Sequence, residues 1–120
     1  MLKRICKITF IAHGSTVHTM AGIISNGLKY PKLNDIGEEE LERVCEYLEK
    51  RGVAYDNIYT SPNACCMQSA QIVAKLFRQK TVPIDLYSRN YGEWQGMLYS
   101  DILNKNGPKS FAQTPENGDL

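Results

Sequence analysis

The sequence lacks several features that would point to particular classes of protein. Its 14 basic and 13 acidic side chains leave a formal net charge of +1, so no excess of positive charge favours binding to nucleic acid or to an anionic membrane. No apolar run approaches the length of a membrane span. The start, residues 1–10, is basic and then apolar, but it is too short for a secretory signal. We therefore expect a cytoplasmic protein whose partners include neither nucleic acid nor a membrane.

Cysteine is present, but not at the spacing of a zinc site. The four cysteines, Cys6, Cys45, Cys65 and Cys66, form no C-x-x-C motif, and the two histidines are not spaced with them as zinc ligands would be. The neighbours Cys65 and Cys66 could form a disulfide with each other only under strain. We predict free thiols in a reducing cytoplasm, no metal site and no cofactor.

The apolar pattern predicts strands that alternate with helices within one small domain. Residues 5–11 are almost continuously apolar, which is typical of a strand buried on both faces of a parallel sheet. Short strands are also predicted at residues 57–60 and 82–86, where Pro83 favours a sheet edge. The alternation indicates an α/β domain with a mostly parallel sheet.

The clearest helix is predicted at residues 35–51. Asp35 and Glu38 have the spacing of a capping box, and Gly52 is a natural stop. Its apolar stripe consists of Leu41, Val44, Cys45 and Leu48.

A second helix is predicted from Ser61, as N-cap, to about Gln79, with Pro62 at the first helical position. Its buried residues are expected to be Ala70, Val73, Leu76 and Phe77. Residues 17–34 are predicted to be a loop with at most a short helix. A turn around Trp94 is predicted at residues 91–96, a short helix at residues 99–105 and a loop at residues 107–120.

Four short motifs follow one another along the chain: IAHGST at residues 11–16, NDIG at residues 34–37, TSPNACCMQSA at residues 60–70 and GEWQG at residues 92–96. They resemble, in the same order, the R-H-G-[ET]-[ST], L-T-x-x-G, S-S-P-x-x-R-x-x-Q-T-A and G-x-W-x-G segments of the histidine phosphatase (phosphoglycerate mutase-like) superfamily. The resemblance is strongest over residues 8–96. It implies a three-layer α/β sandwich, of which residues 1–120 form a single truncated domain, incomplete at its C-terminus.

The resemblance also implies phosphomonoester hydrolysis or phosphoryl transfer without a metal. In such a reaction His13 is the nucleophile, because a neutral imidazole can attack phosphorus without first losing a proton. Gly14, Thr16, Thr19 and Ser61 are the predicted phosphate- or substrate-binding residues, although Thr16 and Thr19 could equally serve the loop backbone alone. The expected ligand is a small phosphorylated metabolite or an inorganic anion.

The chain departs from the family pattern at the catalytic positions. Ala12 and Cys65 stand where the family has arginines, and Ser88 stands where it has an acidic proton donor. A second family histidine is expected beyond the last residue of this chain. Since losing one charge-assisted donor costs about 3 kcal/mol in a transition state, we predict weak or lost activity. Arg89 is the candidate substitute cation.

The sequence is compatible with several interpretations. The chain could be a degenerate phosphatase, an active enzyme that uses Arg89, a non-catalytic anion-binding or protein-interaction module, or half of a larger tandem protein. A homo-oligomer is also open. Cys65 could be a reactive thiol at a helix start, but no C-x5-R loop of the cysteine phosphatases follows it, which favours a buried inert thiol. Trp94 is interpreted as a packing anchor, and His13 would otherwise cap a turn.

Overall fold

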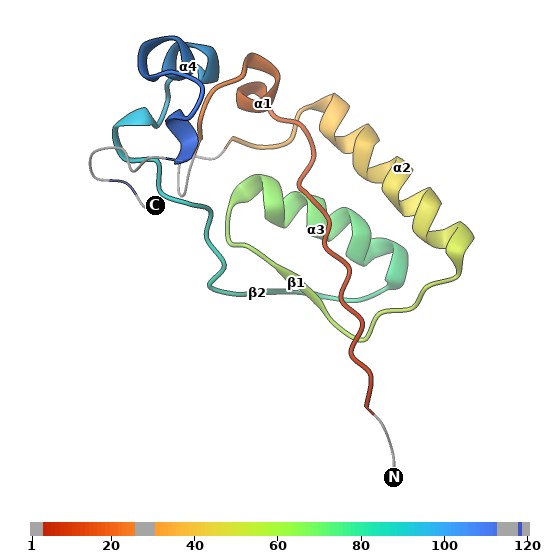
Figure 1. Cartoon of the computed structure of the whole chain (residues 1–120). Coiled ribbons are helices and arrows are strands. Elements are labelled where there is room, and N and C mark those ends of the chain that lie inside the picture. Colours follow the sequence, from red (N-terminus) through yellow and green to blue (C-terminus); the bar gives the residue numbers. More distant parts are fainter. Residues whose placement is uncertain (1–3, 26–30, 113–117, 119–120) are drawn as a thin grey trace.

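The computed structural model describes residues 4–25, 31–112 and 118. Helices and two short strands alternate along the middle of the chain (Figure 1). In chain order, the elements are α1 (Val17–Ala21), α2 (Asp35–Arg51), β1 (Ile58–Thr60), α3 (Ala64–Phe77), β2 (Thr81–Pro83), the 3-10 helix η2 (Gly92–Trp94), α4 (Tyr99–Asn106) and the 3-10 helix η3 (Ser110–Ala112).

The sheet of the described residues consists of β1 and β2, which run parallel with Tyr59 opposite Val82. Parallel strands need a crossover, and α3 supplies it and packs on both strands. Helix α2 in turn packs on α3 (Figure 1). The α/β class with a parallel sheet is confirmed. The described residues supply the sheet and the helical layer on one side of it.

The main core lies between α2 and α3. Leu41 and Leu48 of α2 and Val73 of α3 are buried together. The predicted apolar stripe of α2 therefore faces the core, although its members Val44 and Cys45 are only half-buried. On α3 the prediction of Val73 is confirmed, whereas Ala70, Leu76 and Phe77 are half-buried, and Ala74 and Ser69 are buried instead.

A second group of contacts joins α1 to the C-terminal part of the chain. The Ile24 amide donates to the Met97 carbonyl (2.9 Å), and the Gly96 amide donates to the Ile24 carbonyl (2.7 Å). Phe111 stacks on Tyr99, with ring centroids 4.4 Å apart, and meets the Trp94 ring edge-on at 5.5 Å. Trp94 is only 6% exposed, so its interpretation as a packing anchor is confirmed.

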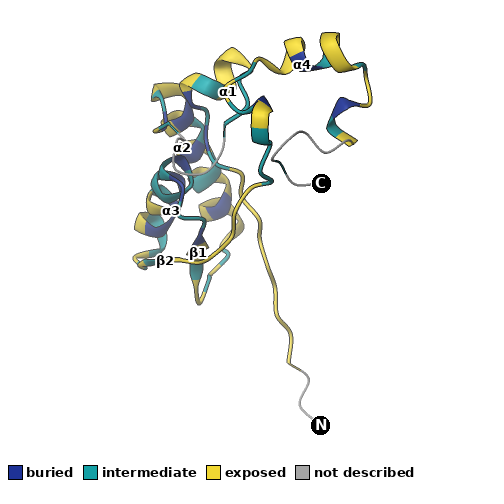
Figure 2. Cartoon of the chain, turned by 90° about the vertical axis from the view of Figure 1, so that its left-hand side faces the viewer, coloured by how far each residue is buried: buried dark blue, intermediate teal, exposed yellow. Residues whose placement is uncertain are grey.

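The strand predicted at residues 5–11 is wrong for this structure. This segment makes no strand (Figure 1), and it is coloured as exposed in Figure 2. Ile5, Ile8 and Phe10 are 80%, 70% and 87% exposed. An apolar segment becomes a buried strand only where a neighbouring strand pairs with it and other elements cover it. Among the described residues, β1 and β2 pair only with each other. The segment makes a side-chain contact instead, from the Tyr55 hydroxyl to the Thr9 hydroxyl (3.0 Å).

The predicted cap of α2 and the predicted start of α3 both differ from the structure. The N-cap of α2 is Asn34, whose side chain accepts from the Gly37 amide (2.8 Å), rather than Asp35. Helix α3 begins at Ala64 after Asn63, so Ser61 is not its cap and Pro62 is not its first residue. The C-terminal stop at Gly52 is confirmed, because this residue has the left-handed φ of 63° that glycine tolerates best.

The remaining predictions are close to the observed elements. The short helix allowed within residues 17–34 is α1, and the helix predicted at residues 99–105 is α4. The strand predicted at residues 82–86 is observed as β2, which begins one residue earlier, at Thr81, and ends at Pro83. Of the predicted tail loop at residues 107–120, residues 113–117 and 119–120 lie outside the described residues, and the described part includes the short helix η3.

Candidate functional site

The loop that carries His13 is held by hydrogen bonds from α2 and α3. The Gly14 amide donates to the Ser69 hydroxyl (3.0 Å), which itself donates to the Cys65 carbonyl (2.7 Å). On the other side, the Asn34 amide donates to the Ser15 carbonyl (3.1 Å), and the Ser15 hydroxyl donates to the Glu40 carboxylate. The loop is therefore fixed between the starts of the two main helices.

Two glycines make this close approach sterically feasible. A Cβ atom on Gly14 would lie 2.5 Å from the Gly37 carbonyl oxygen, and a Cβ atom on Gly37 would overlap the Ser15 backbone. Side chains are absent where the loop meets the first turn of α2, so the two backbones are in direct contact. Gly37 lies in the NDIG motif of residues 34–37, but the motif alone does not predict this contact.

The tautomer of His13 follows from its hydrogen bond. Its Nδ1 lies 2.7 Å from the Gly14 carbonyl oxygen. A carbonyl oxygen can only accept, so Nδ1 carries the proton in this contact. In the neutral ring, Nε2 then holds the free electron pair, which is what a nucleophilic imidazole requires. The ring itself is half-buried.

The first turn of α3 brings polar groups close to His13. Asn63 makes no side-chain capping bond, so the amides of this turn lack the cap that usually satisfies them. The Ser61 oxygen is buried and has no hydrogen-bond partner of normal geometry among the described residues. It lies close enough to the Cys66 sulfur to help lower the pKa of that thiol.

The two adjacent thiols have opposite acidities. The interaction with Cys65 lowers the pKa of Cys66, and the charge of His13 lowers it further, although partial burial acts in the other direction. The pKa of Cys65 is raised by its interaction with Cys66 and by burial. Cys65 is 0% exposed, which agrees with its interpretation as a buried inert thiol. The sequence predicted a free thiol at Cys66, as observed, but no lowered pKa, and only its position beside Cys65 in the motif points to this residue.

Thr16 and Thr19 form the N-terminal cap of α1. The Thr16 hydroxyl accepts from the Thr19 amide (3.2 Å), and the Thr19 hydroxyl accepts from the Thr16 amide (2.8 Å). Thr16 is 1% exposed. These contacts are the backbone role that the sequence left as the alternative to ligand binding. His18 contacts the Ser25 hydroxyl through Nδ1.

Arg89 is held among the C-terminal aromatic residues. Its guanidinium donates to the Phe111 carbonyl (2.7 Å) and lies over the Tyr91 ring, 5.0 Å from the centroid. These contacts hold the guanidinium in the C-terminal cluster, whereas His13 is held between α2 and α3. Binding of an anion by Arg89 would compete with these two contacts.

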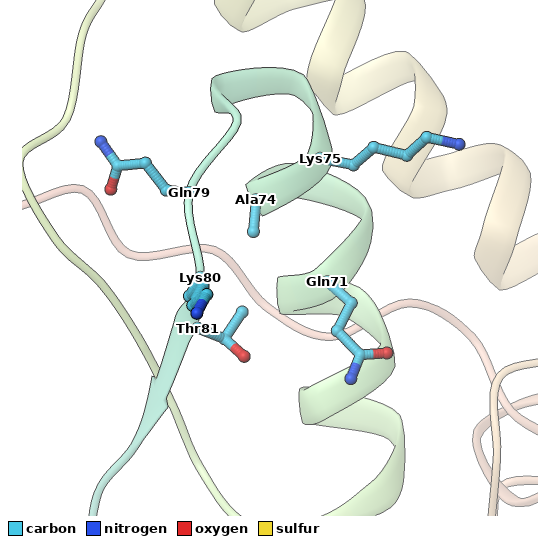
Figure 3. A pocket seen from close by; sticks show the side chains of 6 residues that line it. All are labelled: Gln71, Ala74, Lys75, Gln79, Lys80 and Thr81. Carbon is cyan, nitrogen blue, oxygen red and sulfur yellow. The ribbon is translucent and has the colours of Figure 1, made fainter.

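Two shallow hollows lie elsewhere on α3. Figure 3 shows the first, between the C-terminal half of α3 and the start of β2, lined by Gln71, Ala74, Lys75, Gln79, Lys80 and Thr81. The second shares Gln71 and Lys75 and extends to Leu33 and Glu38 of the α2 region. Neither hollow includes His13.

Among the described residues, no group of three or more His, Cys, Asp or Glu side chains is arranged to hold a metal ion. Within the same part of the chain, no helix is both long and apolar enough to cross a membrane.

The loop, the parallel sheet and the helix order define a class of protein. The model of the histidine phosphatase superfamily (branch 1) matches residues 8–119, and the chain therefore belongs to that superfamily. The broad-specificity phosphatase YOR283W of Saccharomyces cerevisiae is 30% identical over 96% of this chain and 53% of its own length. Phosphoglycerate mutase 1 of the same yeast is 27% identical over 88% of this chain and 44% of its own length.

The fold agrees with solved structures. The mycobacterial glucosyl-3-phosphoglycerate phosphatase superposes with a TM-score of 0.76 at 19% identity, over 89% of this chain and 55% of that protein. The phosphoglycerate mutase-like fold is thereby confirmed. The chain spans about half the length of these relatives.

Proposed function

We propose that the His13 loop and the first turn of α3 bind the phosphoryl group of a small phosphorylated metabolite, or inorganic phosphate. The observation that carries this proposal is the buried Ser61 hydroxyl, which has no partner of normal geometry. Buried hydroxyls are almost always hydrogen-bonded. An anion at this point would accept from Ser61 and would face the positive end of the α3 dipole.

Ser61, Asn63 and His13 stabilise negative charge at this point, because each of them lowers the pKa of the Cys66 thiol. A phosphate would compete with the Cys66 thiolate for these groups. The predicted roles of Ser61 and His13 are therefore retained. The Gly14 amide is not available to an anion, because it already donates to the Ser69 hydroxyl. Gly14 contributes to the site only by allowing the loop to approach α2 closely.

We also propose that phosphoryl transfer to His13 is weak or lost. Ala12, Cys65 and Ser88 replace two arginines and an acid in the family pattern, and Arg89 is bound to Phe111. Each missing bidentate donor costs about 3 kcal/mol of transition-state stabilisation, a factor of at least about 10² in rate. The nucleophile would then lack both charge neutralisation and a proton donor. A cytoplasmic location, favoured by four free thiols, is part of the same proposal.

Binding and turnover can be tested separately with the wild-type chain and His13→Ala. Thermal unfolding in increasing inorganic phosphate should raise the melting temperature of the wild type, and the increase should be smaller in His13→Ala. Release of phosphate from an aryl phosphate should stay at background. Absence of any phosphate-dependent stabilisation would rule out the binding site. Rapid turnover that disappears in His13→Ala would rule out the loss of activity.

A further inference from the structure

Residues 5–11 have the side chains of a buried strand but not its surroundings. Their backbone makes no hydrogen bond with any described residue, and Ile8 and Phe10 are largely exposed. The hydrogen bond from the Tyr55 hydroxyl to the Thr9 hydroxyl (3.0 Å) fixes the segment near the loop before β1. A backbone with unpaired amides and carbonyls, carrying apolar side chains, is what an added strand offers to the edge of a sheet.

The sheet offers a matching edge and an apolar face. Among the described residues β1 pairs with β2 alone, so the other edge of β1 is unpaired within this part of the chain. Tyr59 and Val82 lie opposite each other in the parallel pair, and both are exposed, so they share the sheet face that α3 does not cover. Ile84 and Leu86 continue the spacing of Val82 at every second position and are also exposed. Figure 2 colours both β2 and the N-terminal segment as exposed.

We propose that a second copy of this chain covers this surface, and that residues 5–11 of each copy add a strand to the free edge of β1 in the other. The chain carries both halves of the contact, the unpaired segment and the unpaired edge, so two copies related by a two-fold axis satisfy each other. Within one copy the segment lies near the loop before β1 without pairing with the strand. The charges also fit, because the segment carries Arg4 and Lys7, and Asp56 lies just before β1. A net charge of +1 lets the two copies approach.

The apolar area is large enough for a specific dimer. The exposed apolar side chains of the segment and the sheet include Ile8, Phe10, Tyr59, Val82, Ile84 and Leu86. At about 60–120 Å² each, they supply on the order of 500 Å² per copy, and thus about 1,000 Å² in a dimer. That total reaches the lower limit for a specific interface before the backbone of the added strands is included, and a contiguous apolar patch of this size is typical of an interaction site. This inference goes beyond the proposed function and does not require that phosphate binds.

The first test measures the mass of the chain in solution by sedimentation equilibrium, from about 1 to about 100 µM. A reducing agent prevents the exposed Cys6 from linking two copies. We expect a monomer–dimer equilibrium. Ile8→Asp would place a charge within the added strand and should weaken dimerisation by at least about tenfold. Met20→Asp is the matched control, because Met20 is a similarly exposed apolar residue on α1, outside the proposed surface, and it should leave dimerisation unchanged. A monomer at every concentration, or equal dimerisation of Ile8→Asp and the wild type, would overturn the proposal.

The second test identifies the paired strands by hydrogen exchange of the wild type, at concentrations below and above the midpoint of dimerisation. The amides of residues 5–11 and those on the free edge of β1 should exchange at least about tenfold more slowly in the dimer, whereas those of α1 should not change. This comparison needs no variant, so misfolding of a mutant cannot decide the result. Equal protection of residues 5–11 at both concentrations would show that the segment docks within its own chain. Protection confined to other parts of the chain would show that the copies meet elsewhere, and either result would overturn the proposal.

Discussion

Gly14 and Gly37 lie so close together that a Cβ atom on Gly14 would come within 2.5 Å of the Gly37 carbonyl oxygen. One glycine follows the candidate nucleophile and the other lies in the first turn of α2. Their contact determines how deeply the His13 loop lies against that helix. The position of His13 therefore depends on two residues that carry no functional group.

Gly37→Ala should destabilise the chain by about 3 kcal/mol. Within a helix, this substitution normally stabilises by up to about 1 kcal/mol. Here the new methyl group would overlap the Ser15 backbone, which cannot move as a flexible side chain can. Urea unfolding measures the change. Gly52→Ala is the control, because Gly52 has open space around it and a left-handed φ, and it should cost only about 1 kcal/mol. A Gly37→Ala variant more stable than the wild type would contradict the observed packing.

Ser69→Ala should destabilise the chain by about 1–3 kcal/mol. Ser69 is 5% exposed, and the substitution leaves the Gly14 amide without its acceptor. A buried donor without a partner costs its full desolvation free energy. Ser69→Thr keeps the hydroxyl and is the matched control, with a change expected below about 1 kcal/mol. The measurement is the free energy of unfolding in urea. Equal stability of the alanine and threonine variants would show that this hydrogen bond is not needed.

Local sequence predicts those elements whose boundaries are set by local interactions. Helix α2 is observed over its predicted residues, 35–51, because its apolar stripe and the stop at Gly52 lie within one segment. Its cap is not decided locally, since Asn34 with Gly37 and Asp35 with Glu38 have the same spacing. The Asn34 amide donates to the Ser15 carbonyl, and this distant contact favours Asn34.

The N-terminal segment shows the opposite case. Its apolar residues fit a buried strand, but a strand needs partners that its own sequence does not supply. The radius of gyration of 16.9 Å exceeds the value of about 14 Å expected for a compact chain of this length, which agrees with a segment that extends from the core (Figure 2). Likewise, the motifs include both Gly14 and Ser69, but they did not predict that the Gly14 amide would donate to the Ser69 hydroxyl. That contact forms only when the loop docks on α3.

The contribution of Cys66 to stability should increase with pH from about pH 6.5 to about pH 8.5, below the ordinary pKa of a cysteine. The folded state lowers the pKa of Cys66 below its ordinary value of 9.0, whereas it raises that of Cys65. In this window the unfolded chain keeps both protons, and the folded chain has released the proton of Cys66. Since the unfolded state binds more protons, raising the pH stabilises the folded state, and this contribution is lost as the pH falls through the lowered pKa.

The comparison that isolates this contribution is between the wild type and Cys66→Ser, unfolded in urea with a reducing agent at pH 6.5, 7.5 and 8.5. The difference in unfolding free energy should grow with pH in favour of the wild type. One proton sets a limit of about 1.4 kcal/mol per pH unit, and we expect less than this because solvent screens a half-buried thiolate. Cys6→Ser, at an exposed position, is the control and should differ from the wild type by a constant amount. A constant difference for Cys66→Ser as well would mean that folding does not change the acidity of this thiol.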